Sequence, residues 1–181
     1  MKGIDESRAF VPVRIAVLTV SDTRTEKEDV SGPKLAAMIT AAGHEVAHQN
    51  VVRDDAFAIR ALVESWIVNS NIDVIITTGG TGFTGRDVTP EAMKPLFEKE
   101  IDGFAVLFHQ LSYEKVGTST IQSRACAGVV RNTFIFCLPG SPSACEDAWE
   151  GILKFQFDSR HRPCNFVQII PRLDEHRRAA E

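Results

Sequence analysis

Three continuous apolar runs constrain the fold of this chain more than any other feature. They are residues 14–20 (RIAVLTV), 73–78 (DVIITT) and 133–138 (TFIFCL). Short uninterrupted apolar runs are typical of strands that are covered on both faces, as in parallel sheets. A weaker run at residues 45–52 predicts a further strand.

Amphipathic helices are predicted between these strands. The apolar residues that recur at helical spacing are Leu35, Met38, Ile39 and Ala42; Ile59, Leu62, Val63, Trp66 and Ile67; Met93, Leu96 and Phe97; Phe104, Leu107, Phe108 and Leu111; and Cys145, Ala148, Trp149 and Ile152. Ser31 and Pro33 mark the start of the first helix, and either Asp54 or Asp55 caps the second. Thr89 is expected as an N-cap with Pro90 at the first helical position.

Strands that alternate with helices predict an α/β fold of three layers, doubly wound, with a mostly parallel sheet and helices on both faces. Residues 119–127 are expected to form one more short helix. We predict a single domain over residues 1–181, with a core at about 12–157. Residues 158–172 read as an extended C-terminal arm, and residues 173–181 as a frayed tail.

Composition excludes several classes of protein. With 181 residues and a net charge of −4, the chain has no basic character that would attract nucleic acid or an anionic membrane. No apolar stretch approaches the length of a bilayer span, and MKGIDESRAFVPVR lacks the apolar centre of a secretory signal. We therefore expect a cytoplasmic protein.

The four cysteines are expected to be buried or semi-buried free thiols. Cys126, Cys137, Cys145 and Cys164 show no CxxC spacing, which argues against a zinc or redox site.

The stretch ITTGGTGFTGRDVTPEA, residues 76–92, joins a predicted strand to a predicted helix. Its glycines would let backbone N–H groups approach an oxyanion closely, so the stretch is a candidate phosphate cradle; the alternative is a structural turn. It is not a P-loop, because Arg86 and Asp87 stand where that motif needs Lys and Ser/Thr. The loop after the first strand lacks G-x-G-x-x-G, which argues against a dinucleotide site.

Three aspartates fall on the same predicted edge of the sheet as the glycine loop. Asp22 and Asp54 each follow a strand, and Asp87 lies within the loop. Mg²⁺ favours one or two carboxylates together with substrate phosphates, and this cluster fits that preference. The structural alternative is that Asp54 caps a helix, Asp22 forms an Asx turn and Asp87 neutralises Arg86.

The segments TVSDTR, TTGGTGFTGRDVTPEA, SRACAGV and LPGSPSAC resemble the MoaB/MogA family of molybdenum cofactor biosynthesis proteins over roughly residues 12–157. This family is related to the molybdopterin adenylyltransferase domains of a plant enzyme and of gephyrin. GTSTIQSRA and RPCNF make the chain more similar to the MoaB branch.

The resemblance implies an activity and a set of site residues. The activity is transfer of AMP from Mg-ATP (or a GTP equivalent) to the terminal phosphate of molybdopterin. By position in the motifs, Asp54 and Asp87 would be catalytic and would hold Mg²⁺. Thr78, Gly79, Gly80, Thr81 and Gly82, with Asp22, would surround the nucleotide phosphates. Ser123, Arg124, Pro139, Gly140 and Ser141 would line the pterin or phosphate pocket.

The resemblance also implies an oligomer, a homotrimer or a homohexamer, working with other proteins of the cofactor pathway. The apolar arm residues Phe166, Val167, Ile169 and Ile170 either pack on a neighbouring subunit or cover this chain's own sheet edge. The alternative function is an oligomer that binds pterin or nucleotide without turnover.

Overall fold

The computed structural model describes residues 3–22, 27–68 and 71–178. The strands are β1 (Gly3–Ile4), β2 (Arg14–Val20), β3 (Glu45–Val52), β4 (Val74–Thr78), β5 (Lys99–Glu100), β6 (Cys126–Val130), β7 (Thr133–Leu138) and β8 (His161–Arg162). The helices are α1 (Ser31–Ala41), α2 (Ala56–Val68), α3 (Thr89–Met93), α4 (Asp102–Val116), α5 (Pro142–Ala148), α6 (Lys154–Gln156) and α7 (Glu175–Arg178). Short 3-10 turns occupy Lys94–Leu96, Gly117–Gln122 and Ile170–Arg172, and Trp149–Leu153 is π-helical.

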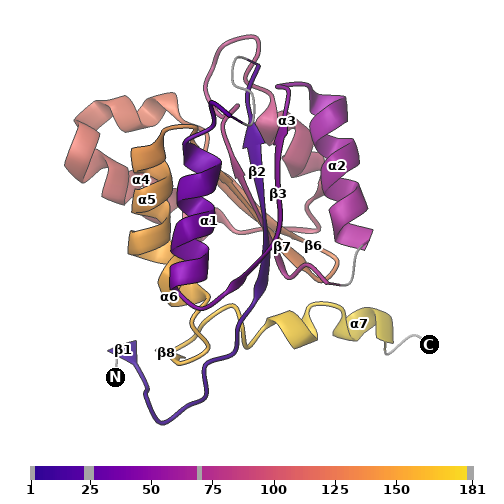
Figure 1. Ribbon diagram of the computed structural model, residues 1–181, viewed down its shortest axis with the longest axis vertical. Coiled ribbons are helices and arrows are strands. Elements are labelled where there is room, and N and C mark those ends of the chain that lie inside the picture. Colours follow the sequence, from indigo (N-terminus) through magenta and orange to yellow (C-terminus); the bar gives the residue numbers. More distant parts are fainter. Residues whose placement is uncertain (1–2, 23–26, 69–70, 179–181) are drawn as a thin grey trace.

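The central sheet has six strands in the order β3-β2-β4-β7-β6-β5. β3, β2, β4 and β7 are parallel, whereas β6 runs antiparallel to β7 and β5 antiparallel to β6. Helices α1, α4 and α5 lie on one side of the sheet, and α2 and α3 lie on the other (Figure 1). The predicted α/β class, with a mostly parallel sheet and helices on both faces, is confirmed.

Each face of the sheet carries its own apolar core, because successive side chains of a strand point to opposite faces. On one side, Ile15, Val17 and Phe136 pack with Leu35 of α1 and Trp149. On the other, the alternate strand residues pack with Ile59, Val63 and Trp66 of α2. β4 and β7 are buried at every position, which explains why their sequences are mostly apolar and uncharged.

The predicted helix at residues 119–127 is wrong. The structure has a 3-10 turn over Gly117–Gln122, and Cys126 then begins strand β6. The sequence of this strand is rich in small residues, so it does not show the apolar pattern of a strand. Residue 128 must be glycine, because a Cβ there would lie 2.2 Å from the ring of Phe97.

The helix starts differ from the sequence prediction in detail. Asp29 accepts hydrogen bonds from the N–H groups of Ser31 and Gly32 at 3.1 Å and so caps α1. Asp55, not Asp54, caps α2 by accepting from Ala58 N–H at 2.7 Å. Thr89 is no N-cap: its hydroxyl donates to the Gly79 carbonyl at 2.9 Å, so it serves the glycine loop instead.

The C-terminal arm is folded back rather than extended. β8 pairs with β1, and Asn165 is buried and donates to the carbonyls of Ser159 and His161. Phe166 and Val167 pack into this chain's own core, which favours the second of the two roles considered for the arm.

Part of the tail is also ordered. Helix α7 holds an ion pair between Arg177 and Glu98, and Asp174 accepts from Asn132 at 2.9 Å. Residues 179–181, and residues 23–26 of the TVSDTR segment and its loop, lie outside the described residues.

All four cysteines are free. Cys126, Cys137 and Cys145 are buried as expected, but Cys164 is exposed because it lies on the surface turn after β8. Among the described residues, no helix is both long and apolar enough to cross a bilayer.

Candidate functional site

A cavity of about 520 Å³ opens at the carboxyl ends of the parallel strands. It lies where the chain reverses direction across the sheet, since β3 and β4 flank β2 on opposite sides. Such switch points are where α/β sheets bind ligands. Its lining includes every predicted site residue except Arg124, namely Asp22, Asp54, Thr78, Gly79, Gly80, Thr81, Gly82, Asp87, Ser123, Pro139, Gly140 and Ser141.

The glycine loop leaves β4 in a conformation that requires glycine. Gly79 and Gly80 have φ values of 106° and 62°. A Cβ at Gly79 would lie 2.1 Å from the Val20 carbonyl oxygen, and one at Gly140 would lie 3.1 Å from the Gly79 Cα. The ends of β2, β4 and β7 therefore meet at backbone contact distance.

The carbonyl oxygens of three successive loop residues all accept hydrogen bonds from other parts of the chain. Gly79 O and Gly80 O accept from the Thr89 hydroxyl and N–H at 2.9 Å, and Thr81 O accepts from Arg124 N–H at 2.9 Å. In a planar trans peptide the N–H points opposite to the C=O. The N–H groups of Gly80 and Thr81 are thereby turned away from Thr89, which suits them to an oxyanion.

Two carboxylates rest directly on the loop. A Cβ at Gly80 would lie 2.7 Å from Asp54 Oδ1, and a Cβ at Gly82 would lie 2.8 Å from Asp87 Oδ2. Asp54 Oδ1 accepts from Val88 N–H at 3.2 Å, and Asp22 Oδ1 accepts from Asp54 N–H at 3.1 Å. The loops after β2, β3 and β4 thus bring three acidic side chains to one cavity, as the sequence predicted.

The carboxylates of Asp54 and Asp87 differ in acidity. Burial, with the negative charges of Asp87 and Asp22, raises the pKa of Asp54 despite the bond from Val88. Burial also acts to raise the pKa of Asp87, but hydrogen bonds, first of all from Thr84, and the charge of Arg124 together hold that pKa below its usual value. A nearby cation would relieve the repulsion that Asp54 feels.

The structural alternatives for these aspartates hold only in part. Asp55 is the helix cap, so Asp54 is not needed for that role. Arg86 pairs with Asp22 at 3.7 Å, while Asp87 accepts from the Thr84 N–H and hydroxyl at 2.8 and 2.6 Å. Asp87 therefore orders its own turn and lines the cavity at the same time.

The residues that the structure describes contain no cluster of three or more Asp, Glu, His or Cys arranged to hold a metal by themselves. A pair of carboxylates beside phosphate oxygens is what Mg²⁺ uses. The donor set at Asp54 and Asp87 fits Mg²⁺ only if a ligand supplies further oxygens.

Hydrogen bonds join β4 to β7 and to the loop after β7, which form one wall of the cavity. The Thr78 hydroxyl donates to Pro139 O at 2.9 Å, and Gly79 N–H donates to Leu138 O at 3.0 Å. Because the Thr78 hydroxyl is engaged there, its contribution to a ligand would come from the main chain. Ser141 Oγ accepts from Ala144 N–H at 3.2 Å and so caps α5.

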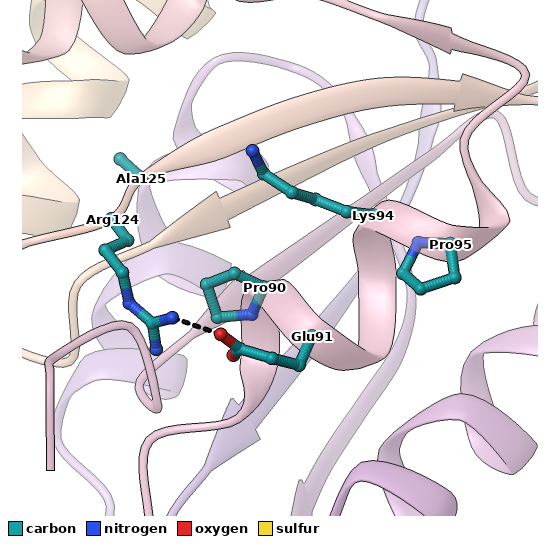
Figure 2. A pocket seen from close by; sticks show the side chains of 6 residues that line it. All are labelled: Pro90, Glu91, Lys94, Pro95, Arg124 and Ala125. Atoms are coloured by element: carbon teal, nitrogen blue, oxygen red, sulfur yellow. Dashed lines mark hydrogen bonds and ion pairs between the residues drawn. The ribbon is translucent and has the colours of Figure 1, made fainter.

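Of Ser123 and Arg124, both expected at the pterin or phosphate pocket, only Ser123 lines this cavity. Ser123 faces the cavity, with a buried hydroxyl that has no hydrogen-bond partner among the described residues. Arg124 instead borders a second cavity with Pro90, Glu91, Lys94, Pro95 and Ala125, and its guanidinium points at the Glu91 carboxylate (Figure 2). Adjacent residues of an extended chain point to opposite sides, which explains the separation.

Sequence reasoning missed several residues that line the cavity. Thr19 and Ser21 flank the end of β2, Arg86 lies in the glycine loop, and Gln122 precedes Ser123. Each lies inside or next to a segment singled out above, so proximity to those segments was the available signal.

Fold and site together define an α/β protein with an acidic, glycine-lined cavity at the switch point of a mostly parallel sheet. A family model described as "Probable molybdopterin binding domain" matches residues 16–158. The chain belongs to this family, within the MoaB/MogA group of molybdenum cofactor biosynthesis proteins.

Relatives and solved structures agree with that assignment. The chain is 50% identical over 160 residues to Molybdenum cofactor biosynthesis protein B of Escherichia coli K12, covering 88% of this chain and 94% of the relative. A protein of the same name from Staphylococcus aureus is 50% identical over 145 residues, which is 78% of this chain and 86% of the relative. A crystal structure of a Molybdenum cofactor biosynthesis protein B superposes with a TM-score of 0.82 at 37% identity, covering 94% and 99% of the two chains.

Proposed function

We propose that this protein is a Mg²⁺-dependent molybdopterin adenylyltransferase of molybdenum cofactor biosynthesis. The observation that carries the proposal is that Asp54 and Asp87 rest on the same glycine loop, in one cavity with its backbone amides. The names of relatives at 50% identity support the pathway.

The residues of the cavity divide into two groups by chemistry. Asp54 and Asp87 would hold Mg²⁺, which when bound neutralises charge on the nucleotide phosphates. The amides of Gly80, Thr81 and Gly82 would bind phosphate oxygens of ATP, or of GTP. Asp22 would hold the Asp54 main chain in place, as its bond to Asp54 N–H suggests.

The opposite wall would receive molybdopterin. The Ser123 hydroxyl, buried and without a partner among the described residues, is available to its terminal phosphate, beside Pro139, Gly140 and Ser141. An oxygen of that phosphate attacks the α-phosphorus of ATP, a new P–O bond forms, and the bond to the bridging oxygen breaks to release pyrophosphate. The reaction needs alignment and charge stabilisation, and it needs no side-chain nucleophile.

The test is to incubate the protein with molybdopterin, ATP and Mg²⁺, and to measure pyrophosphate and the adenylylated pterin. Asp54→Asn and Asp87→Asn should each lower kcat/KM about 100-fold or more, since each removes charge that acts on the reacting phosphates. Asp55→Asn is the matched control: it changes the neighbouring carboxylate, which caps α2, and should leave turnover unchanged.

The competing function is an oligomer that binds pterin or nucleotide without turnover. Binding of Mg-ATP by calorimetry with no pyrophosphate from the wild type would support that function and refute catalysis. Replacing ATP by GTP in the same assay decides the base preference. We place the protein in the cytoplasm, with other proteins of the cofactor pathway as its partners.

A further inference from the structure

Arg124 lies between the glycine loop and helix α3 and borders a second cavity, not the candidate cavity. It is the second residue before β6, and its side chain runs along the loop toward Pro90 and Glu91 (Figure 2). About a quarter of the side chain is exposed, at 26%. Its position therefore differs from that of a residue that contacts substrate in the cavity.

Each nitrogen of the guanidinium has a partner in the chain. Nε donates to Gly82 O at 2.8 Å and lies 3.4 Å from Thr81 O, while Nη2 donates to Asp87 O at 2.8 Å. Nη1 forms an ion pair with Glu91. The guanidinium carbon also lies 5.3 Å from the centre of the Phe83 ring.

These contacts hold the loop at both ends of one segment. Gly82 is the first residue of the segment 82–87 and Asp87 is the last. The single planar guanidinium therefore fixes the carbonyl groups at both ends of this turn. The Asp87 carboxylate in turn rests against Gly82, where a Cβ would lie 2.8 Å from Oδ2. The position of that carboxylate in the cavity therefore depends on a turn whose backbone is held by hydrogen bonds from Arg124.

We propose that Arg124, braced by Glu91, is a positioning residue that fixes Gly82 and Asp87, and that it is not a ligand of the pterin. The part of this inference that concerns Mg²⁺ and nucleotide rests on the proposed function. The planar guanidinium presents its N–H groups in a fixed fork, so it reaches two carbonyls and a carboxylate at once. A lysine ammonium in its place would reach fewer of them.

The first experiment needs no ligand. Hydrogen exchange of the wild type, Arg124→Lys and Glu91→Gln is followed by mass spectrometry over peptides that cover residues 80–88. We expect exchange to be faster in both variants, about 10-fold in Arg124→Lys, because opening of the loop becomes easier. Arg162→Lys is the control, since Arg162 lies on β8, outside the central sheet, and pairs with Asp5 near β1. Unchanged exchange at residues 80–88 in Arg124→Lys would overturn the proposal.

The second experiment separates positioning from substrate contact. In Arg124→Lys and Glu91→Gln we expect the Mg²⁺ concentration for half-maximal activity to rise several-fold and kcat to fall, with the KM for molybdopterin unchanged. A raised KM for molybdopterin with unchanged Mg²⁺ dependence would mean that Arg124 contacts the pterin, and would overturn the proposal. If the wild type neither binds Mg-ATP nor turns over, the proposed function fails, and hydrogen exchange still decides the role of Arg124.

Discussion

At the scale of single residues, the cavity depends on positions where a side chain is excluded. Gly79 combines a φ of 106° with a main chain packed against Val20 O, so both torsion angle and space require glycine there. Gly85, in the same loop, has open space where a Cβ would be and needs neither. The loop is thus rigid at its origin and permissive near its tip.

Gly79→Ala should destabilise the protein by about 3 kcal/mol or more, because the left-handed conformation is strained for alanine and the new Cβ meets a backbone oxygen that cannot move freely. Gly85→Ala should change the free energy of unfolding by less than about 0.5 kcal/mol. Urea denaturation of both variants measures the difference. Equal stability of the two would show that the loop origin relaxes at little cost.

The sequence predicted which residues border the cavity far better than which way each side chain points. Their positions in the motifs predicted that Asp54, Asp87 and the glycines would lie at the same rim. They do so because all follow parallel strands whose carboxyl ends share an edge. Motif position did not separate Arg124 from Ser123, since neighbours along an extended segment face opposite ways and the register at that point is set by tertiary contacts.

At the scale of elements, the start of α1 ties two walls of the cavity together. Asp29 is buried and accepts from the Thr19 hydroxyl at 2.6 Å as well as from two N–H groups of α1. Ser31 donates from its hydroxyl to Gly140 O at 2.9 Å. Hydrogen bonds therefore connect β2, α1 and the loop after β7.

Asp29→Ala should cost about 2–3 kcal/mol of stability, because it removes a helix cap and leaves the buried Thr19 hydroxyl without its acceptor. The comparison is Asp55→Ala, which removes a more exposed cap from α2 and should cost about 1 kcal/mol. Chemical denaturation of both variants gives the two values. A cost for Asp29→Ala no larger than that for Asp55→Ala would argue against the link between β2 and α1.

The elements themselves show where sequence patterns succeed. β2, β4 and β7 were predictable because central parallel strands are buried on both faces and therefore mostly apolar. β6 was not, since CAGVV is short and rich in small residues, and its burial depends on Phe97 packing over Gly128. When a strand is buried by a residue distant in sequence, its own sequence pattern gives little indication that it is a strand.

At the scale of the whole molecule, α4 leaves an apolar stripe uncovered. Val106, Tyr113 and Val116 are 65%, 59% and 54% exposed and recur at i, i+7 and i+10, on one side of the helix. Ile121 in the following turn is 72% exposed. Contiguous apolar surface of this kind is typical of an interaction surface. The arm residues Phe166 and Val167, by contrast, are used within the chain.

We therefore expect the homotrimer or homohexamer implied by the family resemblance to associate through α4. Light scattering at micromolar concentration should give a mass of about three or six times the 19.9 kDa chain. Val106→Glu with Ile121→Lys should shift the mass toward the monomer, because charges buried at an interface without partners oppose association. Phe57→Glu changes a still more exposed apolar residue on α2, on the other face of the sheet, and should leave the mass unchanged. A wild-type species of about 20 kDa would refute the predicted oligomer. Dissociation by Phe57→Glu alone would show that the interface lies on α2 instead of α4.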